Sequence, residues 1–151
     1  ALAMLSDPTP AERETLGAIP YQENLTMLHT DTRILPDRRR IWSSWNYCIP
    51  GEQLDRAVIT YDMNILQSLG ASEEFCVTLN RPEAIARDKI IGSYDYHHPV
   101  YTTAAPAAQK RNGEISGVNR THYAGAYWGY GFHEDGVNGA LAACSYFGKR
   151  L

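Results

Sequence analysis

The pattern of apolar and polar positions along the chain predicts a mixed order of short helices and short strands. Thr9-Pro10-Ala11-Glu12 forms a capping box with proline at the first helical position, and Gly17 is a suitable stop, so we expect a helix between them. Runs of β-forming residues predict five strands, at Leu25–Thr30, Ile41–Tyr47, Ala57–Asp62, Phe75–Leu79 and Ile90–Tyr96. The Pro36-Asp37 turn between the first two strands predicts a hairpin.

The remaining pattern predicts more helix than strand. We expect a helical turn over Asn64–Leu69, a helix within Thr103–Arg111, a turn at Asn112-Gly113, a strand over Val118–Ala126, and a helix over Gly136–Phe147 that stops at Gly148. A strand-to-helix step therefore stands near each end of the chain, with antiparallel strands between them. This order is typical of an α+β fold.

The last predicted helix and the loop before it, "GAYWGYGFHEDGVNGALAAC" (125–144), carry the most informative pattern. An apolar stripe at i, i+3, i+4 and i+7 comprises Val137, Ala140, Leu141 and Cys144, while Gly136, Gly139 and Ala143 leave the other positions small. We expect Asp135 to be the N-cap. A helix start with few side chains exposes N–H groups and the positive end of the helix dipole, which suits phosphate or a delocalised anion.

Two interpretations of this stretch remain open. The glycines can serve only to let a loop pack tightly on the helix, or they can let a flat ligand approach the helical N–H groups. The loop aromatics Tyr127, Trp128, Tyr130 and Phe132 can likewise fill the core or form the wall around a planar ring system.

Composition excludes several classes of function. The chain has 151 residues, of which 44% are hydrophobic, and its 14 basic and 17 acidic residues give a net charge of −3. This balance carries no bulk signal for nucleic acid or an anionic membrane. The basic run Arg38–Arg40, beside Arg33, is interpreted as a solvated turn in preference to a phosphate patch. The sequence shows neither a membrane-spanning stretch nor a signal peptide.

The cysteines and the first residues suggest a context for the chain. Cys48, Cys76 and Cys144 are odd in number and widely separated, which argues against disulfides and structural zinc and predicts a cytoplasmic location. The segment from Ala1 to Leu5 runs directly into a well-signalled helix. We therefore expect the chain to be a fragment of a longer protein.

The segment "YAGAYWGYGFHEDGVNGALAAC" resembles the C-terminal flavin-contacting part of the FAD-dependent amine oxidase superfamily. There a strand that ends in Ala-Gly, here Ala124-Gly125, leads through a glycine-rich loop to a Gly-x-x-Gly-Ala helix, here 136–140. The whole chain is similar to a bacterial group of predicted NAD/FAD-binding proteins. That wider resemblance includes "LHTDTRILP", "SWNY", "TYDMNILQSL", "VTLN", "HPVYTTAAPAAQ" and "GFHEDGVNGAL".

The resemblance implies FAD as the cofactor and a set of residues around it. It places the backbone of Gly136, Val137 and Asn138 near N1 and the C2 carbonyl of the flavin, where the helix dipole stabilises the anionic reduced ring. The neighbouring cofactor-binding positions are Gly125, Ala126, Tyr130, Gly131, Phe132, His133, Glu134 and Asp135. Many superfamily members have an acidic residue at the position of Ala126, and Glu134 or Asp135 is a candidate replacement.

The resemblance also implies an incomplete enzyme. The chain has no Gly-x-Gly-x-x-Gly fingerprint after a strand, which in the family lies at the N-terminus and binds the FAD pyrophosphate. We therefore expect the C-terminal portion of an oxidoreductase, inactive alone and weak or absent in FAD binding, whose partner is the N-terminal half. The expected segments are 1–20, ending an FAD-type domain; 21–117, part of the sheet of a substrate domain; and 118–151, the terminal strand-loop-helix of the Rossmann-like FAD domain.

Three further residues are candidates for the chemistry of the parent enzyme. His29 lies where many amine oxidases place a lysine that contacts flavin N5 through water, so it is the catalytic candidate; a structural hydrogen-bonding role is the alternative. Trp45 and Tyr47 are candidates for the lining of the substrate cavity, or for core positions. The implied substrate is a small molecule, either an amine or lipid-like.

Two rival functions use other features of the sequence. A metal hydrolase would need His97, His98, His133, Glu134 and Asp135 as its ligand set, but the second histidine of a zincin motif is missing. A non-enzymatic interaction domain is the other alternative. Because a fragment exposes apolar surface where its missing half belongs, we expect the isolated chain to self-associate.

Overall fold

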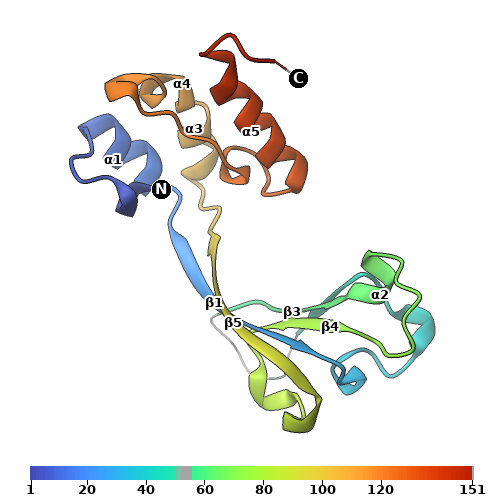
Figure 1. Cartoon of the computed structure of the whole chain (residues 1–151). Coiled ribbons are helices and arrows are strands. Elements are labelled where there is room, and N and C mark those ends of the chain that lie inside the picture. The colour runs from blue at the N-terminus through green and yellow to red at the C-terminus, as the bar shows by residue number, and fades with distance from the viewer. Residues whose placement is uncertain (50, 52–55, 151) are drawn as a thin grey trace. The chain divides into compact units, whose positions relative to one another are not determined.

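The computed structural model of the chain describes residues 1–49, 51 and 56–150 and shows an α+β fold. The chain divides into two compact units, a helical unit of residues 1–22 and 98–151 and a sheet unit of residues 23–97. Figure 1 labels the helices and strands of both units. Among the described residues, no helix is long and apolar enough to cross a membrane.

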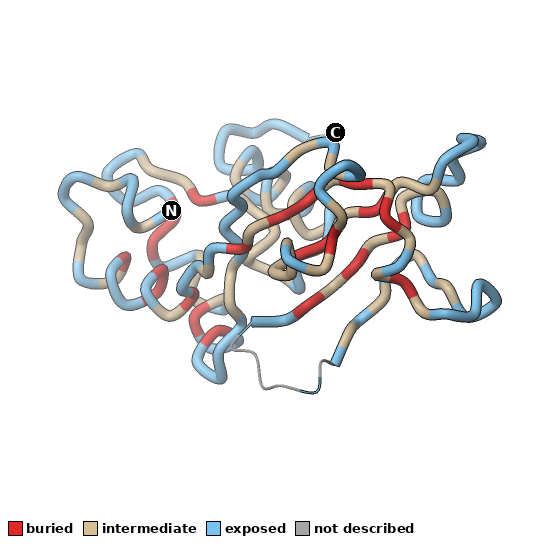
Figure 2. The backbone as a smooth tube through the Cα atoms, turned by 90° about the horizontal axis from the view of Figure 1, so that it is seen from below, coloured by how far each residue is buried: buried red, intermediate tan, exposed pale blue. Residues whose placement is uncertain are grey.

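The helical unit contains four α-helices, α1 (Pro10–Gly17), α3 (Ala105–Gln109), α4 (Asn112–Ile115) and α5 (His133–Ser145), among its described residues. Short 3-10 turns accompany them at η1 (Leu2–Met4), η6 (Val118–Arg120) and η7 (Ala126–Trp128). The core of this unit is a cluster of Leu16, Ile115 and Tyr123. Burial along the chain is coloured in Figure 2, where the C-terminal end is mostly exposed.

Helix α1 begins as its sequence predicts. The Thr9 hydroxyl accepts a hydrogen bond from the Glu12 N–H, and the Glu12 carboxylate accepts one from the Thr9 N–H, so the capping box is complete. The other Glu12 oxygen accepts the Tyr123 hydroxyl proton, and this bond lowers the pKa of Glu12. Burial and the same bond raise the pKa of Tyr123. The cap therefore also fastens α1 to the core.

The sheet contains β1 (Tyr21–His29), β2 (Trp45–Cys48), β3 (Val58–Asp62), β4 (Cys76–Leu79) and β5 (Ile90–Pro99), in the order β2-β3-β4-β1-β5. The pairs β2–β3, β3–β4 and β4–β1 are all antiparallel. The sheet unit also contains α2 (Met63–Leu66) and the turns η2 (Thr32–Ile34), η3 (Arg39–Ile41), η4 (Pro82–Ala84) and η5 (Arg87–Lys89). The five predicted strands up to Tyr96 are therefore present, with shifted ends.

The predicted hairpin of the first two strands is wrong, because β3 and β4 lie between β1 and β2. Both sides of β1 are occupied, by β4 and β5, and the Asp31 carboxylate accepts hydrogen bonds from Arg33 and from the Ala86 N–H, which hold the chain after β1 beside residue 86. The chain then passes through η3, so the second strand begins at Trp45 and not at Ile41.

The predicted strand over Val118–Ala126 is also wrong. Gly117, Asn119 and Arg120 have positive φ angles of 88°, 50° and 59°, which break an extended strand and give the turn η6. The expected turn at Asn112-Gly113 is instead the first part of α4. The C-terminal segment is therefore a loop followed by a helix, without the preceding strand that the resemblance implied.

Candidate functional site

The loop before α5 (residues 125–132, hereafter the glycine loop) is held from two sides by side chains of neighbouring helices. From α5, the Asp135 carboxylate accepts hydrogen bonds from the N–H groups of Tyr130 (3.0 Å) and Phe132 (2.9 Å). From α3, the Gln109 amide donates to the carbonyls of Tyr127 (3.0 Å) and Gly129 (2.6 Å). The loop conformation is therefore fixed by specific polar contacts.

Helix α5 begins at His133, three residues earlier than the sequence predicted. Its N-cap is Phe132, and Asp135 lies at the third helical position, so the expectation that Asp135 is the N-cap is wrong. The physical reason is that the Asp135 side chain reaches back to the Phe132 N–H, as the last residue of a capping box does.

This shift changes which backbone groups are available at the helix start. The Gly136 N–H already donates to the Phe132 carbonyl, at 3.2 Å. The N–H groups of the first helical turn belong instead to His133, Glu134 and Asp135. Two of these residues are acidic, which complements the helix dipole, and the Asp135 carboxylate is engaged by the loop.

The small side of α5 packs against the glycine loop. A Cβ atom at Gly139 would lie 3.0 Å from both the backbone N and the backbone O of Gly125, and one at Gly136 would lie 3.9 Å from Ala126. Gly139 is therefore required for the close approach of helix and loop. The sequence left two interpretations open for the glycines. For Gly139 the structure shows the first, in which the glycine lets the loop pack tightly on the helix.

The apolar stripe of α5 faces outward as a consequence. Val137, Ala140 and Cys144 are exposed and Leu141 is partly exposed, and α5 has no fully buried residue. The face of α5 that carries Gly136 and Gly139 therefore packs against the glycine loop, and the side chains of the apolar stripe stay exposed or partly exposed.

The four loop aromatics divide into two pairs. Tyr127 and Trp128 pack against the core cluster and against each other, with ring centroids 5.0 Å apart, and burial raises the pKa of Tyr127 to about 12. Tyr130 and Phe132 are 85% and 70% exposed. The first pair fills the core, and the second pair is available to a ligand or partner.

Gly131 separates these two exposed aromatics. Its φ of 90° lies in the left-handed region, and a Cβ atom there would lie 2.8 Å from the Tyr101 hydroxyl. The other predicted cofactor-binding positions lie in the same loop and first turns: Gly125, Ala126, His133, Glu134, Gly136, Val137 and Asn138. The structure thus brings the predicted cofactor-binding set together in one loop-helix segment.

His29, the catalytic candidate, lies in the sheet unit and is fully buried at the end of β1. Its Nδ1 atom accepts the Asp31 N–H at 3.1 Å, and its Nε2 atom lies 2.8 Å from the Thr78 hydroxyl oxygen. The Thr78 oxygen lies 2.8 Å from that of Thr60. Both ring nitrogens are therefore engaged within the protein, and the catalytic assignment of His29 stays a prediction.

The protonation of His29 follows from these contacts. Burial lowers the pKa of the imidazole, and the nearby Asp31 carboxylate opposes this effect. Because Nδ1 accepts a backbone N–H, the neutral ring carries its proton on Nε2 and donates it to Thr78. The charge of Asp31 itself is secured by hydrogen bonds from Arg33, which hold the pKa of this carboxyl well below its usual range.

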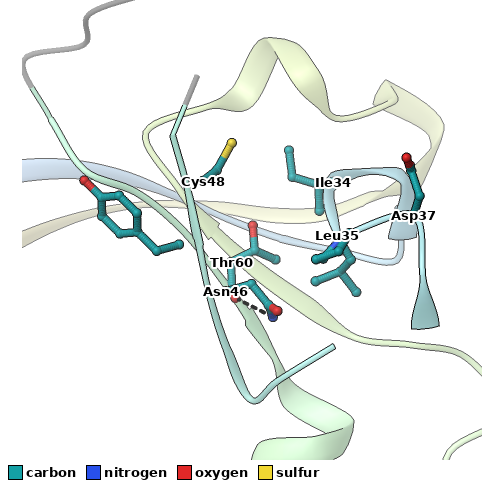
Figure 3. Close-up of a pocket in the computed structure, with 8 residues that line it drawn as sticks. Ile34, Leu35, Asp37, Asn46, Cys48 and Thr60 are labelled. Carbon is teal, nitrogen blue, oxygen red and sulfur yellow. Dashed lines mark hydrogen bonds between the residues drawn. The ribbon is translucent and has the colours of Figure 1, made fainter. Parts of the chain in front are cut away.

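Trp45 and Tyr47, the substrate-binding candidates, lie on the exposed face of β2. Tyr47 lines a pocket of about 290 Å³ in the sheet unit, together with Ile34, Leu35, Pro36, Asp37, Asn46, Cys48 and Thr60. Figure 3 shows this pocket. Trp45 is not among the described lining residues.

Sequence reasoning missed the residues that organise both regions. Gln109, which holds the glycine loop, sits in a helix of alanines with no motif around it. Thr60 and Thr78 are central residues of β3 and β4, paired directly across the sheet. The two hydroxyls come together only because β3 pairs with β4, and the sequence alone did not predict that pairing.

The rival metal site gains no support. The described residues contain no group of three His, Cys, Asp or Glu side chains that could hold a metal ion. The arginine run is partly neutralised, since Arg39 pairs with Glu74 at 2.9 Å and lies over the Trp42 ring, while Arg33 pairs with Asp31 at 2.6 Å. These contacts agree with the interpretation of the run as a solvated turn, because the Arg39 side chain stays 78% exposed.

Comparison with known proteins does not identify a relative. No protein-family model matches the chain, and no curated protein matches it. Its function is therefore argued from its own residues and geometry.

The contact between Gly139 and Gly125 predicts that alanine at position 139 destabilises the fold more than alanine at position 113 does. Gly139→Ala places a methyl group against the loop backbone and should lower the free energy of unfolding by about 1–3 kcal/mol. Gly113→Ala is the matched control, because it also lies in a helix but meets no atom within 4 Å. Denaturant titration of both variants measures the difference, and equal stability would show that the loop does not rest on α5.

The environment of His29 predicts a loss of stability in mild acid. Because burial holds its folded-state pKa below the ordinary value of 6.5, the unfolded chain binds the proton more readily. The stabilising contribution is complete above pH 6.5 and declines as the pH falls from 6.5 towards the folded-state pKa. Thermal unfolding of the wild type and of His29→Gln across this range measures it. The variant should show a flatter acid limb, and superimposable slopes would refute the assignment.

Proposed function

We propose that this chain is the C-terminal part of a flavin-dependent oxidoreductase, in which the glycine loop and the start of α5 face the pyrimidine edge of FAD. The observation that supports it most is the exposed surface at this point. Tyr130, Phe132 and Val137 form an uncovered apolar and aromatic group beside the N–H groups of the first helical turn. A planar ring with an electron-rich edge needs both kinds of contact.

The residues present fit the isoalloxazine ring of FAD, but they do not fit the rest of the cofactor. The aromatic side chains can cover apolar ring surface, and the first-turn N–H groups can donate to ring carbonyl and nitrogen atoms. The described chain has no glycine-rich turn between a strand and a helix that could hold the pyrophosphate. That part of FAD would be bound by the N-terminal half of the parent protein.

When bound, FAD supplies the hydride chemistry of such enzymes. The contribution of this chain is electrostatic and steric. The N–H groups of His133 and Glu134 would donate to the ring edge, and the exposed aromatics would exclude water from it. The parent substrate in this proposal is an amine or a lipid-like molecule, and the isolated chain is inactive.

Exposed apolar side chains also support a partner for each unit. In the sheet unit they include Trp45, Tyr47 and Ile49, and in the helical unit they include Tyr130, Phe132 and Val137. In the parent protein the remaining polypeptide would cover them, and in the isolated chain they would promote self-association. The three cysteines are all free thiols, which is consistent with a cytoplasmic location.

The proposal is tested on the natural polypeptide that contains this sequence, by its upstream sequence and its flavin content. It should carry a strand–Gly-x-Gly-x-x-Gly–helix unit before Ala1 and should purify with the absorption bands of oxidised flavin. Phe132→Ala should weaken flavin retention about tenfold, the size expected for loss of one aromatic contact of about 1.4 kcal/mol. Phe147→Ala is the control, because Phe147 is similarly exposed but lies beyond the far end of α5.

Two outcomes would overturn the proposal. One is a natural polypeptide that lacks the dinucleotide fingerprint and purifies without flavin. The other is a flavoprotein in which Phe132→Ala and Phe147→Ala retain flavin equally, because the cofactor would then lie away from the start of α5.

A further inference from the structure

The pocket of about 290 Å³ lies entirely within the sheet unit, between the turn after β1 and the strands β2 and β3. Its walls on one side are the aliphatic side chains of Ile34, Leu35 and Pro36. Cys48 lies opposite, and Figure 3 shows the Thr60 hydroxyl directed into the space between Cys48 and Ile34. The volume is at the lower end for ligand pockets, so it suits a small molecule.

The hydrogen bonds beneath the pocket run from His29 through Thr78 to Thr60, and the geometry between the two hydroxyls admits either one as the donor. Neutral His29 donates its Nε2 proton to the Thr78 oxygen, since its Nδ1 atom accepts the Asp31 N–H. Thr78, which is fully buried, then has Thr60 as the acceptor for its own proton. Donation from Thr78 to Thr60 satisfies the proton of the fully buried Thr78, and the proton of Thr60, which lines the pocket, is then left to donate elsewhere.

This proton has no acceptor among the hydrogen bonds of the described residues, although Thr60 is only 2% exposed. A buried hydroxyl donor without an acceptor is costly, and a pocket atom that accepts the proton would remove the cost. In this arrangement Thr60 presents a hydroxyl donor at the pocket floor.

Among the other polar lining residues, the side chains of Asn46 and Cys48 are already engaged. The Asn46 amide donates to the carbonyls of Ser43 and Thr60, and its oxygen accepts the Ser43 N–H. The Cys48 sulfur accepts a hydrogen bond from Arg81, at 3.2 Å. Asp37 is exposed, so it can be hydrated at the mouth. An occupant consequently meets aliphatic walls and the buried hydroxyl donor of Thr60.

We propose that this pocket binds a small, neutral, mainly apolar molecule through a carbonyl oxygen that accepts the Thr60 hydroxyl proton. Apolar surface of the ligand replaces water against the aliphatic wall, and the carbonyl completes the chain that begins at His29. The site uses no residue of the glycine loop or α5. It therefore stands or falls independently of the flavin proposal.

Acetophenone and ethylbenzene are suitable probes, because they differ only in that a methylene group replaces the carbonyl. Alkylation of Cys48 by iodoacetamide, followed by mass spectrometry, reports occupancy of the pocket. Cys144 is exposed and lies in the other unit, so its alkylation in the same sample is the internal control. At a concentration of about ten times its Kd, acetophenone should slow alkylation of Cys48 about tenfold and leave Cys144 unchanged.

Ethylbenzene should bind about fivefold more weakly, the factor expected for one hydrogen bond of about 1 kcal/mol. Thr60→Val removes the donor at constant volume and should abolish this preference, whereas Thr60→Ser should keep it. The wild-type comparison of the two probes decides the proposal even where Thr60→Val does not fold. Unprotected Cys48 with both probes, or equal protection by both, would overturn it.

Discussion

The buried face of the sheet carries a line of polar side chains that must satisfy one another, and the sheet unit depends on this constraint. His29, Thr78 and Thr60 come from three strands, and each contributes a group that would be costly to bury alone. Their bonds form only in the observed strand order and register, in which Thr60 lies opposite Thr78. The polar line therefore selects one pairing of strands as well as stabilising it.

The same constraint affects the neighbouring groups. Cys76 is buried near Asp62 and Glu74, and burial together with these carboxylates raises the pKa of its thiol to about 12. The Asp62 carboxylate accepts the Ile65 N–H and so begins α2 directly after β3. Charged and polar side chains on this face thus serve the fold, while the Thr60 hydroxyl is the point at which the line meets the pocket.

Helices and strands that depend on interactions between near neighbours in the sequence were predicted. Arrangements that depend on contacts between distant residues were not. The Thr9 capping box and the short β-forming runs act over a few residues, so α1 and the strands of the sheet were predicted. The hairpin prediction failed because β4 and β5, which come later in the chain, occupy both sides of β1. The predicted strand over 118–126 failed because Asn119 and Arg120 adopt left-handed conformations, which Asn favours over most residue types but Arg does not.

The candidate site shows the same division. Composition identified the glycine loop, but only the contact of Gly139 with Gly125 shows that the small face of α5 points inward and the apolar stripe outward. Asp135 was expected to be the N-cap, but it lies at the third helical position, from which it bonds to the N–H groups of Tyr130 and Phe132. The pocket had no sequence signal, because its floor and walls come from separate strands and turns.

The most direct measurement is the imidazole nitrogen NMR spectrum of His29 near neutral pH. The account predicts a neutral ring with its proton on Nε2, because Nδ1 accepts the Asp31 N–H and Nε2 donates to Thr78. With this tautomer Thr78 accepts from His29, and donation from Thr78 to Thr60 leaves the Thr60 proton for the pocket. A ring protonated on Nδ1, or a charged imidazolium, would contradict it.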